Sequence, residues 1–351
     1  MPEANQLEIR NLSVAFADTD RDVVCLDAID LTLHSGEILG LVGESGCGKS
    51  TLCRAILRSL RAPAYIASGR MMWKGQDLFE LDEAALNRVR WREIALVVQS
   101  SLDALNPVMR IERQLVDAMR VHMRWTRAQE LARCHELLEW VGLPRRILQS
   151  FPFEMSGGMR QRVVIAMALA LEPQLLIMDE PTTALDVVTQ AEILGRIREL
   201  QKEQNFSVIL VTHDLPLALD FCHSIAVMYA GRIVEKAASR VLVHNPRHPY
   251  TEGLLQAFPR ADERHAPHRG VPGDPACLTS LPGGCPFHPR CTSATGLCAK
   301  ITPDLIVCDE HALACHHPRG VVPPHQDMRA SKGAIPIRDR VQHRALQGVR
   351  L

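Results

Sequence analysis

Residues 43–50, Gly-Glu-Ser-Gly-Cys-Gly-Lys-Ser, match the pattern G-x-x-x-x-G-K-[ST] of a loop that binds nucleotide phosphates. The apolar run at 37–42 predicts a buried strand before the loop, and residues 51–57 predict a helix after it. Glycines let the backbone approach a phosphate, while backbone amides and the helix N-terminus face the anion. Lys49 is expected to reach the β- and γ-phosphates, and the Ser50 hydroxyl to hold Mg2+. We therefore predict that ATP is bound by Gly43, Glu44, Ser45, Gly46, Cys47, Gly48, Lys49, Ser50 and Thr51.

A second apolar run, at 175–178, predicts a strand that ends in the carboxylates Asp179 and Glu180. Beside a phosphate loop, Asp179 can hold Mg2+ through water. Glu180 stands where a base could polarise the water that attacks the γ-phosphate. In isolation this segment would be interpreted as a core strand ending in solvated acids. Its combination with the phosphate loop favours hydrolysis of ATP.

Ser156-Gly157-Gly158 opens another predicted helix, which continues as the apolar run 163–171. A glycine-opened helix N-terminus suits a second anion. One ATP molecule does not need two such cradles in a single subunit. The simplest explanation is that the second cradle serves the ATP of a partner subunit.

These motifs together resemble the ATP-binding-cassette (ABC) family. Within that resemblance, Gln99 fits the Q-loop, which implies a role in catalysis and at Mg2+, and His213 fits the switch histidine. Phe16 is placed like the aromatic residue that stacks on adenine, although a lone Phe in an early strand is more often core. The signature is assigned to Ser156, Gly157, Gly158 and Met159, and the D-loop to Ala184, Leu185 and Asp186.

The resemblance implies an α/β fold with a P-loop NTPase core, an N-terminal antiparallel β subdomain, an inserted helical subdomain and a small Cys-rich C-terminal extension. We predict an ATPase domain at 1–243, which includes the helical subdomain at 101–155. The extension is expected at 244–318, and composition predicts a disordered tail at 319–351. Within the helical part, residues 126–129 are predicted to form a capping box.

Composition sets limits on the function of the 351-residue chain. Its formal net charge of +0 argues against nucleic acid as the main partner. Its longest apolar run is far shorter than the roughly 20 residues that span a bilayer. The sequence opens with no pattern typical of a signal peptide, so we expect a soluble, cytosolic protein. A role in transport would require membrane-spanning partners on separate chains.

Six of the 11 cysteines fall between Cys277 and Cys315. In a cytosolic chain, cysteines close in sequence suggest a metal site rather than disulfides. Five residues separate Cys285 from Cys291 and six separate Cys291 from Cys298, wider than the usual zinc spacing. Spacing alone leaves an iron–sulfur cluster and zinc both open.

Residues 245–255 and 284–291 look like the C-terminal extension of the oligopeptide and dipeptide permease ATPase subunits. Some members of that family carry a [4Fe–4S] cluster. The resemblance therefore implies this cofactor, with Cys315 preferred over Cys308 because 314–316 matches the family's closing motif. The implied ligands are Cys285, Cys291, Cys298 and Cys315. Because none of them lies in an ATP motif, we expect ATP binding to be independent of these cysteines.

The resemblance covers residues 5–318 and implies the ATPase subunit of a peptide-type ABC importer at the cytoplasmic face of the cell membrane. Its expected partners are a second cassette in a heterodimer, two membrane-spanning permease subunits and, indirectly, an extracytoplasmic solute-binding protein. The family usually has Phe-Gln-Asp-Pro at the Q-loop, where this chain has Val-Gln-Ser-Ser at 98–101, which puts the identity of the membrane partner in doubt. The alternatives are a soluble iron–sulfur ABC ATPase acting on ribosomes or nucleic acid, and a non-hydrolysing cassette.

Overall fold

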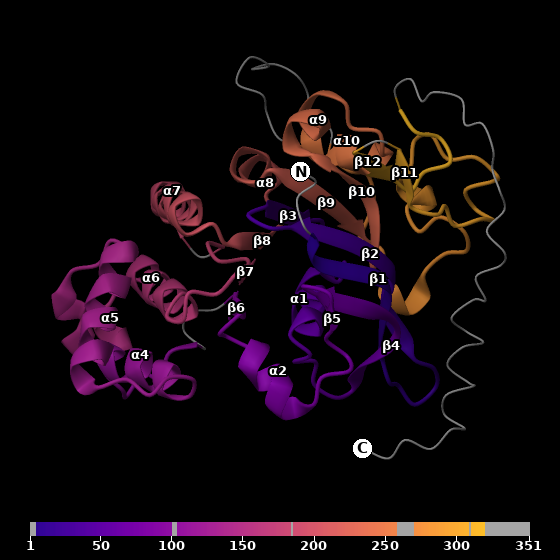
Figure 1. Ribbon diagram of the computed structural model, residues 1–351. Helices are drawn as coiled ribbons and strands as arrows, with labels where there is room; N and C mark the ends of the chain where they lie inside the picture. Colours follow the sequence, from indigo (N-terminus) through magenta and orange to yellow (C-terminus); the bar gives the residue numbers. More distant parts are fainter. Residues whose placement is uncertain (1–4, 100–103, 184, 258–269, 309, 320–351) are drawn as a thin grey trace.

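The computed structural model describes residues 5–99, 104–183, 185–257, 270–308 and 310–319. An antiparallel sheet in the order β2-β1-β4-β5 lies beside the phosphate loop's helix (Figure 1). The predicted N-terminal β subdomain is thereby confirmed. Its strands are β1 (Asn5–Phe16), β2 (Val23–His34), β4 (Ala64–Trp73) and β5 (Gln76–Asp77).

The central sheet has eight strands in the order β11-β12-β10-β9-β3-β8-β7-β6, of which β6, β7, β8, β3 and β9 are parallel. Strands β3, β7 and β8 are buried along their whole length, as expected for parallel strands covered on both faces. The strands are β3 (Ile38–Val42), β6 (Ile94–Val97), β7 (Leu175–Asp179), β8 (Ser207–Thr212), β9 (Ser224–Tyr229), β10 (Arg232–Ala238), β11 (Ile306–Cys308) and β12 (His311–Leu313).

A helical lobe lies beside β6 and β7 (Figure 1). It extends beyond the predicted bounds of 101–155 to Ala168, because α6 packs against α4 and α5. Thr126 and Gln129 make the expected capping box at the start of its second helix, and Gly142 follows the helix with φ +66°. The lobe contains α4 (Ile111–Arg120), α5 (Arg127–Trp140), α6 (Gly157–Ala168) and the 3-10 turns η1 (Arg145–Gln149) and η2 (Pro152–Glu154).

The other helices connect the strands of the two sheets and continue into the extension. They are α1 (Lys49–Ile56), α2 (Glu83–Val89), α7 (Val187–Gln204), α8 (Leu215–Phe221), α9 (Ser239–His244), α10 (Pro249–Gln256) and the 3-10 turns η3 (Leu278–Ser280) and η4 (His288–Arg290). No helix in the described ranges is long and apolar enough to span a bilayer.

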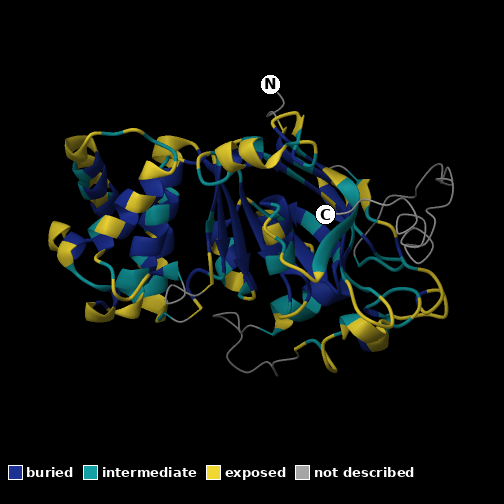
Figure 2. Cartoon of the chain, turned by 90° about the horizontal axis from the view of Figure 1, so that it is seen from below, coloured by how far each residue is buried: buried dark blue, intermediate teal, exposed yellow. Residues whose placement is uncertain are grey.

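Two cores hold these layers together. One lies between the antiparallel sheet and the central sheet and includes Leu12, Leu52 and Ile177. The other runs from the far face of the central sheet into the helical lobe and includes Leu137 and Leu210. Figure 2 shows the buried strands at the centre of the molecule and the exposed residues on the outer faces of the helices. Because both cores contact the parallel strands, the strand ends that carry the motifs are rigidly placed.

The residues after 243 do not form a separate unit, because strand β12 pairs with β10 at the edge of the central sheet. Glu235 on β10 is fully buried and accepts hydrogen bonds from His311 Nε2 at 2.7 Å and from the amides of Arg247 and His248 at 2.7 and 3.1 Å. Burial alone would raise the pKa of Glu235, but these donors hold it below its ordinary value. The sequence boundary near 243 therefore crosses a continuous structure. The predicted tail falls almost wholly outside the described residues.

Candidate active site

The four motifs of the predicted ATP site meet at one edge of the central sheet. The phosphate loop follows β3, Asp179 and Glu180 end β7, His213 follows β8, and Gln99 follows β6. These strands are parallel neighbours, so their carboxyl ends lie along the same edge, where open α/β sheets bind ligands. The fold therefore gathers motifs that are spread over more than a hundred residues of sequence.

Glycines allow the phosphate loop to pack tightly against the sheet. A Cβ atom on Gly43 would lie 2.3 Å from the carbonyl oxygen of Met228 on β9, so no side chain fits there. Gly48 caps α1 with φ +105°, a conformation that favours glycine. The loop can therefore turn directly from β3 into α1, and the amides at the start of α1 face the same space.

Lys49 is held inside the phosphate loop. Its ammonium donates to the carbonyl oxygens of Gly43 at 2.7 Å and Glu44 at 3.0 Å, and the residue is only 5% exposed. The main chain thus fixes a positive charge within a loop whose amides suit phosphate oxygens. The contact of Lys49 with the β- and γ-phosphates stays a prediction.

Two of the three residues predicted at Mg2+, Ser50 and Asp179, contact each other, whereas the third, Gln99, contacts Glu180. Ser50 Oγ donates to Asp179 Oδ1 at 2.9 Å, although the residues are 129 apart in the sequence. Burial raises the pKa of Asp179, with the neighbouring Glu180 adding to the rise and the Ser50 hydrogen bond opposing it. Hydroxyl and carboxylate oxygens are the donors that Mg2+ prefers, so this pair fits the metal that accompanies ATP.

Glu180 is the centre of a small polar cluster. Gln99 Nε2 donates to one carboxylate oxygen at 2.9 Å, and His213 Nδ1 lies 3.5 Å from the other. Thr183 Oγ1 also donates to the carboxylate, at 3.1 Å, a contact that the sequence analysis missed. The backbone of Glu180 has φ +47°, in the left-handed region, which is uncommon for a residue with a side chain. The three predicted catalytic residues are therefore brought together, with the carboxylate oriented by its neighbours.

The predicted signature and D-loop share a different place. Ser156 caps α6 and accepts from the amide of Met159 at 3.3 Å, and a Cβ on Gly158 would lie 2.8 Å from Thr189. Asp186 caps α7 through the amide of Thr189 at 2.9 Å. A cleft of about 470 Å3 is lined by Ser156, Gly157, Gly158, Met159, Arg162, Leu185 and Asp186 among others. Among the described residues that line it, none comes from the phosphate loop.

The structure does not test the roles predicted for two other residues, Phe16 and Ala184. Phe16 ends β1 and is partly exposed, where it pairs with Val23 and Ala64 of the neighbouring strands. Its role in adenine stacking stays a prediction. Ala184 of the predicted D-loop lies outside the described residues.

The four predicted cluster ligands line one small pocket, and Cys308 is not among the residues that line it. Burial raises the pKa of Cys315 to about 11, and the neighbouring sulfurs of Cys285, Cys291 and Cys298 add to that rise. Burial also raises the pKa of Cys285 and Cys291, and the backbone amides of Phe287 and Ser293 partly oppose that rise. Within the described ranges, no three His, Cys, Asp or Glu side chains are grouped so that they could hold a metal ion. The thiols therefore share a pocket without forming a ready-made site for a single ion.

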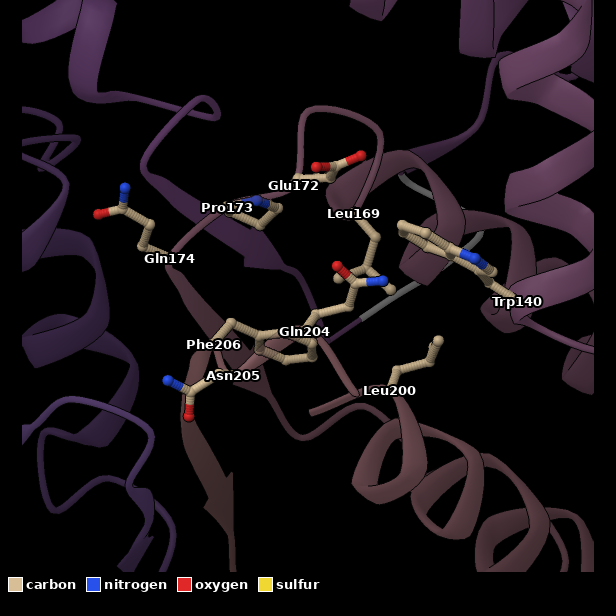
Figure 3. Close-up of a pocket in the computed structure, with 9 residues that line it drawn as sticks. All are labelled: Trp140, Leu169, Glu172, Pro173, Gln174, Leu200, Gln204, Asn205 and Phe206. Carbon is tan, nitrogen blue, oxygen red and sulfur yellow. The ribbon is translucent and has the colours of Figure 1, made fainter. Parts of the chain in front are cut away.

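A further pocket lies at the opposite end of the strands. It has a volume of about 140 Å3 and an apolar floor of Leu169, Leu200 and Phe206, with Trp140 at one side (Figure 3). Gln174 precedes β7 and Phe206 precedes β8, so the pocket is at the amino ends of strands whose carboxyl ends carry Glu180 and His213. It is therefore separate from the predicted ATP site.

The chain matches two protein-family models. The model for ABC transporters matches residues 26–183, and the model for the C-terminal region of oligopeptide/dipeptide transporters matches residues 234–298. The first match covers the phosphate loop and the acidic strand. The second covers three of the four predicted cluster cysteines.

Curated relatives are similar over most of their length. An oligopeptide transport ATP-binding protein of Salmonella typhimurium is 42% identical over 299 residues, which cover 85% of this chain and 89% of the relative. A dipeptide transport ATP-binding protein of Caldanaerobacter subterraneus is 39% identical over 313 residues, which cover 88% and 96%.

The fold is also similar to a solved ATP-binding cassette, MJ0796, in a dimeric post-hydrolysis state bound to ADP and phosphate. The TM-score is 0.61 at 26% identity, and the match covers 67% of this chain and 99% of the cassette. The site geometry and these similarities agree. The chain belongs to the oligopeptide/dipeptide family of ABC transporter ATP-binding proteins, and it is an ATPase subunit of such an importer.

Proposed function

We propose that two cassettes bind two ATP molecules between them, each ATP held by the phosphate loop of one subunit and the Ser-Gly-Gly signature of the other. The observation that carries this proposal is the cleft at residues 156–159, which is built like an anion site but contains no residue of the chain's own phosphate loop. The exposed D-loop neighbours Val187 and Val188, at 81% and 68%, support burial against a second cassette. The similar cassette MJ0796 is itself dimeric.

Hydrolysis follows from the cluster around Glu180. Water attacks the γ-phosphorus, the bond to the oxygen that bridges the β- and γ-phosphates breaks, and the proton of the water passes to Glu180, so that ADP and phosphate are released. Mg2+, held by Ser50 and Asp179, would neutralise charge on the phosphates. Gln99 and His213 orient the carboxylate from both sides, which suits a base that must face one water molecule.

Contact with a membrane-spanning subunit is best supported beside the Q-loop. Ile111 donates its amide to the carbonyl oxygen of Ser150 at 3.0 Å, which brings the segments 106–111 and 149–153 together. On these segments Val108 and Phe153 are 81% and 70% exposed. Exposed apolar side chains grouped in this way suit a partner helix. We propose that this surface receives the permease subunit and passes closure of the cassettes to it.

The transported solutes are proposed to be peptides, in line with the names of the relatives. Those names refer to transport, which favours an importer over the soluble ATPase on ribosomes or nucleic acid. The partner cassette is proposed to be a different chain, and the assembly to lie at the cytoplasmic face of the cell membrane together with its permease subunits and a solute-binding protein.

The dimer requirement provides the test of this function. The isolated chain is expected to hydrolyse ATP very slowly and to be mostly monomeric, and activity is expected on adding the permease subunits and the second cassette. Steady-state phosphate release and the mass in solution would be measured on the same samples. Rapid turnover by a demonstrated monomer would contradict the sandwich mechanism.

We also propose that the small C-terminal extension carries a [4Fe–4S] cluster bound by Cys285, Cys291, Cys298 and Cys315. Support comes from the pocket that these four thiols share, because four separated thiolates are the ligand set of such a cluster. Burial raises the pKa of Cys285 and Cys291, so binding of iron by these thiols would release their protons. The cluster would make the extension's fold depend on its metal.

Chain purified without oxygen is therefore expected to be brown and to contain about four irons and four sulfides per chain. Cys298→Ser is expected to bleach the protein and to open residues 280–318 to protease, because the buried sulfur holds this part of the chain. Cys308→Ser is the matched control, since Cys308 does not line the pocket. Stoichiometric zinc without sulfide in protein never exposed to air would instead favour a structural zinc site.

A further inference from the structure

A residue of the C-terminal extension contacts the phosphate loop directly. The guanidinium of Arg290 forms two hydrogen bonds with the carboxylate of Glu44, Nη1 to Oε2 at 2.7 Å and Nη2 to Oε1 at 2.9 Å. The two residues are 246 apart in the sequence. A two-pronged pair of this kind fixes the orientation of both groups as well as their separation. Glu44, the first variable residue of the phosphate-loop motif, is thus bound to the extension by an ion pair.

The main chain of Glu44 is held as well. Its amide donates to the Tyr250 hydroxyl at 3.0 Å, and its carbonyl oxygen accepts from the ammonium of Lys49 at 3.0 Å. Tyr250 is fully buried and comes from α10 in the extension. The extension therefore supports both the side chain and the backbone of Glu44, next to the lysine that faces the phosphates.

Arg290 is itself rigidly placed. Its side chain is only 7% exposed, and Nε donates to the carbonyl oxygen of Pro272 at 2.6 Å. It lies in η4, between Cys285 and Cys291, and its amide donates to the carbonyl oxygen of Phe287 at 3.0 Å. A buried guanidinium with this many partners cannot adopt another rotamer. Any shift of residues 285–291, the cysteine loop, therefore moves the positive charge of Arg290.

An aromatic cluster holds the cysteine loop beside the phosphate loop. The ring of Phe287 packs edge-on against Tyr229 at 5.2 Å and at a tilt against Tyr250 at 5.3 Å between centroids. Tyr229 ends β9, the strand against which Gly43 packs. The position of Arg290 is therefore set by the central sheet as well as by the extension.

Charge gives this contact a functional consequence. The Glu44 carboxylate, 23% exposed, belongs to a loop whose purpose is to hold the phosphates of ATP, which are also negative. Like charges repel strongly where water is partly excluded. Arg290 neutralises the carboxylate and also keeps it turned toward the extension.

We infer that Arg290 is a positioning residue of the ATP site, through which the cysteine-bearing loop at 285–291 sets the affinity of the phosphate loop for ATP. This inference rests on ATP binding by residues 43–51, which the parent chain tests in the same experiment. It also predicts that opening the extension weakens ATP binding. The positions of the motifs alone had instead predicted that ATP binding is independent of the cysteines of the extension.

A double-mutant cycle tests the inference on the full chain, with the Kd for ATP measured by equilibrium titration. Arg290→Gln is expected to raise the Kd roughly tenfold, because it leaves a bare carboxylate beside the phosphates and frees the loop. Adding Glu44→Gln is expected to restore most of the affinity, because the repelling charge is then gone. In the assembled transporter, Arg290→Gln is expected to raise the KM for ATP far more than it lowers kcat, because the cluster around Glu180 is untouched.

Arg319→Gln is the matched control. Arg319 also belongs to the extension and pairs with Glu252 at 3.1 Å, but it does not contact the phosphate loop. Arg319 also donates to Thr292 and Ser293 beside the loop at 285–291, so protease protection of residues 280–318 is measured on the same variant. An equal loss of affinity while these residues stay protected would mean that the extension acts without Arg290, and it would overturn the role given to Arg290. An unchanged Kd in Arg290→Gln would also overturn it. So would a double variant whose change in Kd equals the product of the changes in the two single variants.

The parent chain and a milder variant keep the result interpretable. If Arg290→Gln does not fold, Arg290→Lys retains the charge without the two-pronged geometry and is expected to raise the Kd by a smaller factor. An unchanged Kd in a folded Arg290→Lys variant would then contradict the inference. A parent chain that itself fails to bind ATP would contradict the assignment of the phosphate loop instead.

Discussion

Replacing Glu180 by Gln is expected to lower the turnover of the assembled transporter roughly a hundred- to ten-thousand-fold, the usual range for loss of a general base. ATP binding should remain, because Lys49 and the loop amides, which are predicted to hold the phosphates, are held in place without the Glu180 carboxylate. The amide keeps the shape of Glu180 and can still contact Gln99, so the defect should lie in the chemical step. Rapid-quench measurement of a single turnover, together with titration of bound ATP, would separate the two effects.

The matched control is Glu139→Gln on the exposed face of α5, which removes the same charge far from the motifs. It should leave both turnover and binding unchanged. A Glu180→Gln transporter that hydrolyses ATP near the parent rate, with the partner cassette independently silenced, would show that Glu180 is not the base. An equal loss of ATP affinity would show that the carboxylate acts in binding rather than in hydrolysis.

Ser156→Arg is expected to abolish turnover at the partner's ATP site while this chain's own phosphate loop still binds nucleotide. The new side chain would fill the mouth of the cleft at 156–159 and remove the hydroxyl that caps α6. In a dimer with a different cassette, nucleotide trapped at the partner's loop should be lost, and nucleotide trapped at this chain's loop retained. Photolabelling each subunit with an azido analogue of ATP would count the two sites separately.

Thr126→Arg provides a control for the loss of a helix cap, because Thr126 caps α5 as Ser156 caps α6. Loss of such a cap lowers the free energy of unfolding by about 1 kcal/mol. This variant should lose some stability and keep both nucleotide sites. Loss of this chain's own site alone in Ser156→Arg would refute the head-to-tail arrangement. Nearly normal turnover would show that the signature does not contact ATP in either subunit.

Much of the ATP site was predictable because each motif is local. The strand, the glycine loop and the helix at 37–57 are adjacent in the sequence, and Asp179 and Glu180 directly follow an apolar strand. Parallel strands present their carboxyl ends at one edge, so these motifs had to meet once the strands were recognised. The capping box at 126–129 was equally predictable, because it involves residues three positions apart.

Contacts that depend on the three-dimensional packing of the chain could not be predicted in this way. Thr183 contacts Glu180 because the backbone turns at Glu180, where φ is +47°. The extension joins the central sheet because β12 pairs with β10. The sequence suggested a boundary near 243, where composition changes. Composition carries no information about which strand edge remains open for pairing.

The sequence by itself determined which groups are available for chemistry: the phosphate loop at 43–50 and the carboxylates of Asp179 and Glu180 each lie within a few contiguous residues. Only the tertiary structure decided that Arg290, between two predicted cluster ligands, lies against Glu44 of the phosphate loop. The physical reason is separation. A pair of residues 246 apart meets only when the sheet, α10 and the aromatic cluster around Phe287 are packed together, and no spacing in the sequence records that packing.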